Sequence, residues 1–143
     1  MNREIKFRGK SSVTNEWVYG SLVNVGNESH IVGFDEVDLD GHHLMYCSDR
    51  PVFTKQGTIG QFTGLHDKNG KDIYEGDIVE TPLLDPIFGD IIKDSFCKAE
   101  IRFNKGSFVV SYYGREHNIY IQDLHDKIKV IGNIYDNKDL LEE

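Results

Sequence analysis

The clearest pattern in the chain is an alternation of apolar and polar residues in its last third. Ala99, Ile101 and Phe103 alternate with charged residues, which is the period of a strand with one buried face. The turn 104–106 follows, and its glycine can adopt a left-handed backbone conformation. The run 107–113 then carries apolar residues at every second position. Together these features predict a β-hairpin.

Strands are also expected in most other parts of the chain. The pair Asn69-Gly70 is a strong hairpin signal. Glu75-Gly76 turns the chain into a strand that starts at Asp77, and this turn resembles the opening of small SH3-like barrels. The remaining strands are expected at 5–8, 17–23, 119–121 and 128–134.

Helix is scarce in the sequence. The only helix we expect is short, at 137–143, with Asn137 as its N-cap. Many short strands separated by turn residues indicate a mainly β fold, either a barrel or a sandwich.

Residues 81–92 differ from the rest, because two prolines stand among bulky apolar residues there. Proline argues against a central strand, so we expect a connection. The preferred interpretation is a loop folded back over the end of the barrel. The alternative is an exposed apolar loop that docks a partner or a sister subunit.

Composition and charge narrow the function classes. The chain has 143 residues, of which 38% are hydrophobic, enough for one packed domain. No apolar stretch approaches the length of a membrane span, and the first residues lack the apolar core of a secretory signal. The net charge of −8 disfavours non-specific binding to nucleic acid. Cys47 and Cys97 form no Cys-x-x-Cys motif, which fits the cytoplasm.

Motifs for catalysis, metals or cofactors are missing from the sequence. Acidic residues at 36, 38 and 40 precede Gly41 as in a calcium-binding loop, but Cys47 stands where the bidentate glutamate should be. The histidines form no His-Glu-x-x-His, and no Gly-x-Ser-x-Gly is present. We therefore expect no catalytic residues, no metal site and no cofactor, and we expect that the protein is not an enzyme.

A basic N-terminal strand is the one feature that favours nucleic acid. Arg3, Lys6, Arg8 and Lys10 are interleaved with Phe7, and such a pattern can track phosphates and stack bases. The preferred interpretation is a solvated strand face whose cations pair with the surplus acids.

Three blocks of the chain stand out together, in order. They are 5–10 with 16–22, then 58–79, then 130–137 with 140–141. Together they resemble the YopX proteins of bacteriophages and prophages. The resemblance implies a mainly β fold with an SH3-like β-barrel in the C-terminal part, and the cytoplasm of a bacterial host, but no established activity. Residues 23–57 match nothing specific, and 81–92 depart from the family.

The division that follows is a strand-rich N-terminal part, 1–57, packed with a barrel part, 58–143, as one compact unit. The central block 58–79 has two interpretations. In the preferred one it is structural, and its apolar residues join the two parts as a core. Those apolar residues are Phe62, Leu65, Ile73, Tyr74, Ile78 and Val79. In the rival one, its polar residues form a patch that binds a partner. Those polar residues are Gln61, Thr63, His66, Asp67 and Asp77.

The leading hypothesis is a non-enzymatic protein-interaction module whose protein partner is unknown. Association of the chain with further copies of itself, as a homo-oligomer, is one form of this hypothesis. The second hypothesis is a nucleic-acid-associated module that uses the basic N-terminal strand. The third is a small-ligand binder or an enzyme with a site that the sequence does not reveal.

Overall fold

The structure is a computed structural model that describes residues 3–32, 34–39, 42–47, 54–85, 87–112 and 118–142. For 34–39, 42–47 and residue 118 it describes the backbone alone. The chain divides into two compact units, Met1–Phe62 (unit 1) and Thr63–Glu143 (unit 2), and each is described by itself.

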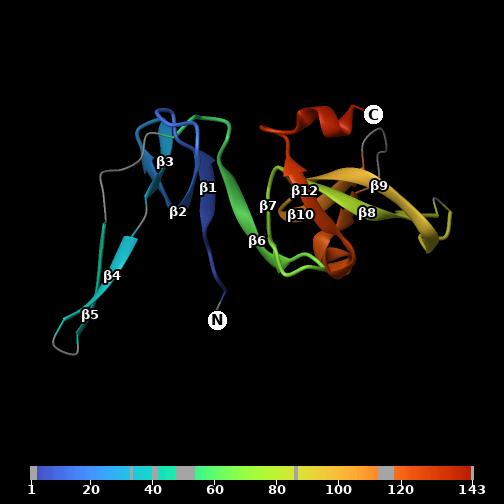
Figure 1. Ribbon diagram of the computed structural model, residues 1–143, viewed down its shortest axis with the longest axis horizontal. Coiled ribbons are helices and arrows are strands. Elements are labelled where there is room, and N and C mark those ends of the chain that lie inside the picture. Colours follow the sequence, from blue (N-terminus) through green and yellow to red (C-terminus); the bar gives the residue numbers. More distant parts are fainter. Residues whose placement is uncertain are drawn as a thin grey trace. The chain divides into compact units, whose positions relative to one another are not determined.

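The described elements are strands, apart from three short 3₁₀ helices (Figure 1). The mainly β class is confirmed, with two five-stranded antiparallel sheets. No sheet of the described strands closes into a barrel, so the SH3-like barrel stays a prediction. The strands are β1 Phe7–Lys10, β2 Trp17–Val25, β3 Glu28–Val32, β4 Phe34–Leu39, β5 His42–Cys47, β6 Gly60–His66, β7 Asp72–Tyr74, β8 Asp77–Leu84, β9 Ile91–Asn104, β10 Ser107–Tyr112, β11 Asn118–Tyr120 and β12 Lys129–Asn133. The 3₁₀ helices are η1 Ile121–Asp123, η2 His125–Lys127 and η3 Lys138–Leu141.

Unit 1 is organised around β1, which pairs with β2 on one side and with the first residues of β6 on the other. β2 continues into a hairpin with β3, and β4 pairs with β5 in a separate hairpin. β1 starts and ends two residues later than the predicted strand 5–8. The residues of β1 pair with β2, and Gly9 continues the strand instead of ending it, because it lies against the Thr54 side chain, where no Cβ would fit.

The sheet of unit 2 has the order β11-β10-β9-β8-β12. The predicted hairpin is confirmed as β9 and β10, but its connection has two residues instead of three, because Asn104 pairs with Ser107. Lys105 and Gly106 have φ values of 50° and 82°. Left-handed backbone at both central positions is the turn geometry that matches the twist of paired strands.

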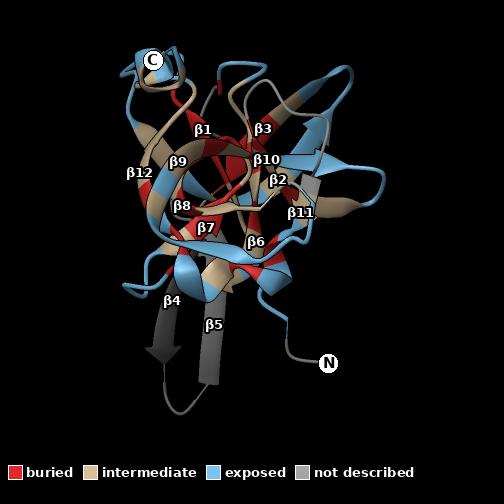
Figure 2. Ribbon diagram, turned by 90° about the vertical axis from the view of Figure 1, so that its right-hand side faces the viewer, coloured by how far each residue is buried: buried red, intermediate tan, exposed pale blue. Residues whose placement is uncertain are grey.

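The core of unit 2 lies on one face of this sheet. Its fully buried members include Ile73, Val79, Ala99, Ile101 and Val110. The predicted core residues of the central block are confirmed as buried, with Leu65 partly so. The central block residues that the structure buries are Phe62, Ile73, Tyr74, Ile78 and Val79. Figure 2 shows buried residues along β8 and exposed residues in the turns.

The C-terminal helix is shorter than predicted. It is the single 3₁₀ turn η3, and Asn137 occupies its N-cap position without capping it. The Asn137 Oδ1 atom instead accepts a hydrogen bond from the amide of Asn133 at 3.2 Å. The run 119–121 is largely the strand β11, and 128–134 contains β12, with η1 and η2 between them.

The prediction of a loop over 81–92 is wrong. Thr81–Leu84 continue β8, and Ile91 and Ile92 begin β9. Pro82 is accommodated because the register of the two strands shifts between Pro82 and Leu84. The segment is therefore the end of a long hairpin and not a loop folded back over a core.

Candidate functional site

The far ends of β8 and β9 form a two-stranded ribbon, which we call the arm. Its described residues are Pro82–Leu84, Ile91–Phe96 and, in the turn between them, Asp85 and 87–90. β12 pairs with β8 only as far as Glu80, and β10 pairs with β9 only from Ala99 onward. Among the described residues, no third strand therefore lies beside the arm, which extends past β10 and β12 (Figure 1).

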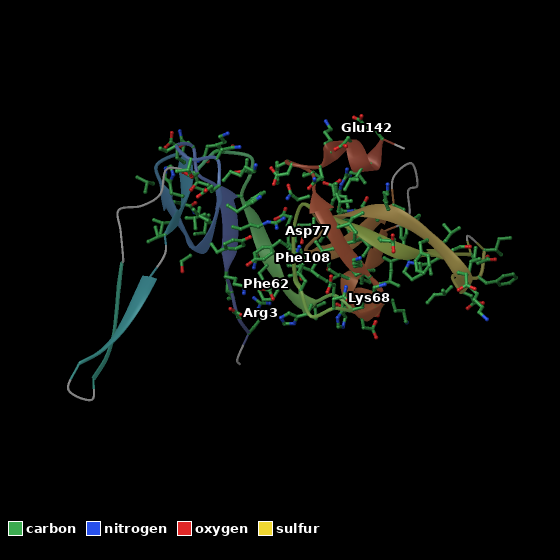
Figure 3. The ribbon with its side chains drawn as sticks, in the orientation of Figure 1. Arg3, Phe62, Lys68, Asp77, Phe108 and Glu142 are labelled. Carbon is green, nitrogen blue, oxygen red and sulfur yellow. The ribbon has the colours of Figure 1, made fainter. Side chains whose placement is uncertain are left out.

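The arm carries a cluster of exposed apolar side chains. An isolated two-stranded hairpin is marginally stable in water, so the arm gains from any surface that covers this cluster. Figure 3 shows side chains spreading from the end of the ribbon that lies farthest from the rest of unit 2. The exposed fractions are 81% for Ile87, 78% for Phe88, 45% for Ile91, 37% for Ile92 and 56% for Phe96.

The turn at the end of the arm is held by Asp85. Its Oδ1 atom accepts hydrogen bonds from the amides of Ile87 at 2.8 Å and Phe88 at 2.9 Å. The Asp85 carbonyl accepts a bond from the Gly89 amide at 2.9 Å, and the Asp85 amide donates to the Asp90 carbonyl at 2.7 Å. The amides of Phe88 and Ile87 hold the pKa of Asp85 below its usual value. Four hydrogen bonds of Asp85 therefore shape the turn that presents Ile87 and Phe88 to solvent.

Replacing Asp85 with Ala is expected to loosen this turn without unfolding the protein. The amides of Ile87 and Phe88 lose their shared acceptor but stay hydrated, because the turn is exposed. Hydrogen exchange at these two amides should become several-fold faster, while exchange in β10 stays unchanged. Unchanged exchange at both amides would contradict the role of Asp85.

A bulge interrupts β9 within the arm. Pro82 pairs with Phe96 and Leu84 with Ile91, so five steps along β9 match two steps along β8. Asp94 lies in this extra stretch with a φ of 57°. Bulges of this kind twist the edge of a strand and interrupt its row of backbone hydrogen-bonding groups. A partner of the arm would therefore contact its side chains more readily than add a strand to its backbone.

The predicted polar patch is mostly used inside the fold. Thr63 Oγ1 donates to the Ile73 carbonyl at 2.8 Å. The buried Asp77 accepts a bond from the Tyr74 amide at 2.8 Å. The structure therefore ties both side chains to the backbone.

Asp67 is the most heavily used of these residues. Its carboxylate accepts hydrogen bonds from the amides of Asn69 at 2.8 Å, Lys71 at 2.9 Å and Val130 at 2.9 Å. Burial raises the pKa of Asp67, but these amides and the charge of Lys71 outweigh it, so the pKa lies below its usual value. Asp67 thus joins the turn after β6 to β12.

The other two residues of the predicted patch differ in exposure. His66 is exposed and lies 2.9 Å from a carboxylate oxygen of Asp72, and its carbonyl is 2.9 Å from Nδ1 of His125. Gln61 is half-buried in β6. His66 is thus the member whose side chain reaches furthest into solvent.

The basic N-terminal strand is only partly accessible. Arg8 and Lys10 are buried, and their charged groups lie 4.6 Å and 5.4 Å from the centre of the Trp17 ring. Lys6 pairs with Glu4 at 3.2 Å and lies 4.5 Å from the centre of the Phe62 ring. Arg3 is exposed, and Figure 3 shows it before β1 begins. A surface that tracks phosphates needs exposed cations, which Arg8 and Lys10 do not supply.

A sequence model described as YopX protein matches residues 6–142, nearly the whole chain. The chain belongs to the YopX family. The crystal structure of protein EF1440 from Enterococcus faecalis matches with a TM-score of 0.62 and 24% identity, over 98% of this chain and 99% of that one. This likeness concerns the fold alone. No curated protein matches.

This YopX-family chain also has an open hollow of about 270 Å³ in unit 2. Within it, Arg102 Nε donates to Glu100 Oε2 at 2.6 Å, so two of its charges neutralise each other. The lining residues are Glu75, Gly76, Glu100, Ile101, Arg102, Phe103, Ile134 and Tyr135.

The described parts of the chain hold no group of three or more residues that could bind a metal ion. The predicted acidic turn lies only partly within them: Glu36 and Asp38 belong to β4, opposite Met45 and His43, and residues 40 and 41 lie outside the described residues. None of the described helices is long and apolar enough to cross a membrane.

The strands of the arm were not predicted from the sequence, where proline argued for a loop. The alternative interpretation of 81–92, an exposed apolar segment, is confirmed in its exposure by Ile87 and Phe88, and the docking of a partner stays a prediction.

Proposed function

We propose that this member of the YopX family is a non-enzymatic protein-interaction module, and that the arm is the part that contacts another protein chain. The observation that carries the proposal is the exposed apolar cluster on a turn that Asp85 holds in place. Burial of apolar surface is favourable by about 25 cal/mol per Å². A turn that is already ordered loses little entropy on binding, so more of this gain remains as affinity.

The non-enzymatic part of the proposal is supported by how the polar residues are used. Thr63, Asp67 and Asp77 serve the backbone instead of facing a cleft. The family resemblance supports a phage or prophage origin, a cytoplasmic location and an SH3-like C-terminal part, and these belong to the same proposal.

Removal of the apolar turn is expected to abolish partner binding. The tagged full chain would be compared with the double variant Ile87→Ser, Phe88→Ser in purification from cells that contain the native partners. The matched control is Val13→Ser, Val25→Ser, which removes two exposed apolar side chains from unit 1. Proteins that co-purify with the wild type and the control, but not with the arm variant, are the expected result. Equal recovery with the arm variant contradicts the proposal.

The same purification tests the nucleic-acid alternative. Contacts with phosphates weaken steeply as salt is raised, whereas apolar contacts do not. Nucleic acid that co-purifies at low salt, and is lost both at high salt and in the variant Arg3→Ala, would instead favour the basic N-terminal strand.

A further inference from the structure

We propose that the arm packs against the same arm of a second copy of this chain, antiparallel about a two-fold axis. This inference rests on the proposed function, since it names the partner that the arm contacts. It follows from the amount of apolar surface on the arm, from the order of its residues and from the placement of its charges.

The exposed apolar surface of the arm is close to what one side of a small interface needs. At roughly 200 Å² for a large side chain, the five exposed fractions amount to about 600 Å². Because Ile91 and Ile92 face opposite sides of the ribbon, two copies would bury less than about 1,200 Å², which is the size of a weak, concentration-dependent contact. The apolar surface of one arm is at the upper end of what a monomer leaves uncovered.

The order of residues along the arm is self-complementary. Ile87 and Phe88 lie at the turn, Phe96 lies at the other end of the arm, and Ile91 and Ile92 lie between them on opposite faces of β9. If two arms overlap antiparallel, one of these two isoleucines from each arm lies at the centre of the contact, and Phe96 of each arm lies toward the turn of the other. A two-fold axis lets one arm supply both halves of every contact, which is the commonest symmetry of protein dimers.

Charge distinguishes the antiparallel arrangement from a parallel one. The turn is acidic, with Asp85 and Asp90, whereas the exposed Lys93 lies further along β9, next to the exposed Asp94. The antiparallel overlap places Lys93 of each arm beside Asp90 of the other. A parallel overlap would instead bring like charges together, which is unfavourable.

The bulge at Asp94 limits the assembly to a closed pair. A regular open edge could add strands without end, as in fibres, but a left-handed residue and a shifted register disturb that edge. Contact through side chains about a two-fold axis is made by the same surface of both copies, so it pairs one chain with one other.

The mass of the full chain in solution tests the proposal. Sedimentation or light scattering over a concentration series should show a mass that approaches twice 16.4 kDa and falls on dilution. Ile87→Ser, Phe88→Ser should remain a monomer at concentrations where Val13→Ser, Val25→Ser dimerises, with unchanged circular dichroism in both. A wild type that stays monomeric, or an arm variant that dimerises normally, overturns the proposal.

Charge reversal tests the antiparallel arrangement. Lys93→Glu and Asp90→Lys should each weaken dimerisation by about tenfold, because each creates two like-charge contacts. The double variant should restore it, and failure to restore it overturns this arrangement. A monomeric wild type that still loses its co-purifying proteins in the arm variant overturns the second copy as partner, while the proposed function stands.

Discussion

Replacing Asp67 with Asn is expected to lower the free energy of unfolding by about 3 kcal/mol. The carboxylate accepts hydrogen bonds from three backbone amides, of Asn69, Lys71 and Val130. An asparagine has one acceptor oxygen, so its NH₂ group would face an amide that is itself a donor. A hydrogen bond to a charged group contributes about 1.5–3 kcal/mol, and a buried amide left without an acceptor costs a further amount of ~1–3 kcal/mol.

Urea denaturation followed by circular dichroism measures this loss. The matched control is Asp126→Asn, which removes a carboxylate from the exposed surface of η2 and should change stability by less than about 0.5 kcal/mol. Equal stability of the two variants would show that the amides around Asp67 find other acceptors.

The pKa of Asp67 gives the same interaction a pH dependence. Its pKa is lower in the folded protein than the usual 3.8. The folded state therefore binds this proton less readily, and the stabilisation is fully present above the unfolded pKa and lost as the pH falls through the folded pKa. The difference in stability between wild type and Asp67→Asn should be large at neutral pH and should shrink below a pH of about 4.

Replacing Ile101 with Ala is expected to cost about 2–5 kcal/mol, because it leaves a cavity in the core of unit 2. Ile101 is fully buried in β9, where it pairs with Val110 of β10. Both are members of one buried cluster, so few neighbouring groups can move into the space.

The control for this variant lies two residues further along the same strand. Phe103 is 54% exposed and meets the Phe108 ring edge-on at 5.1 Å. Phe103→Ala removes a larger side chain but creates no enclosed cavity, so it should cost less than Ile101→Ala. If Phe103→Ala lowered the free energy of unfolding more than Ile101→Ala, the assignment of Ile101 to the core and of Phe103 to its edge would be contradicted.

Strand periodicity predicts which residues share a face, but not how far along the strand that face stays covered. Ala99, Ile101 and Phe103 were expected to be equivalent, yet the first two are buried and Phe103 is not. The hairpin itself followed from the alternation in both strands and from Gly106 in the turn, whereas the left-handed backbone of Lys105, which shortens the turn, did not.

The arm escaped prediction because proline is read as a strand breaker. Pro82 lies within β8 close to a shift in register, where the strand tolerates a residue without an amide hydrogen. The pattern of apolar residues at 81–92 was visible in the sequence. Their exposure depends on where β10 and β12 stop pairing, which is a property of the whole sheet.

The polar residues of the central block show a second limit. In the sequence, Asp67 and Asp77 cannot be distinguished from aspartates that bind a ligand. Only the positions of distant amides, such as that of Val130, show that Asp67 serves the fold. Sixty-three residues separate these two partners, so no local pattern could have joined them.

The packing around Trp17 makes tryptophan fluorescence a signal for the folding of unit 1. Trp17 is the single tryptophan of the chain, and the charged groups of Arg8 and Lys10 in unit 1 lie 4.6 Å and 5.4 Å from the centre of its ring. Its emission changes when these cations leave the ring, whereas circular dichroism detects strands in both units. Comparing the two signals during denaturation shows whether units 1 and 2 unfold in one cooperative step or in succession.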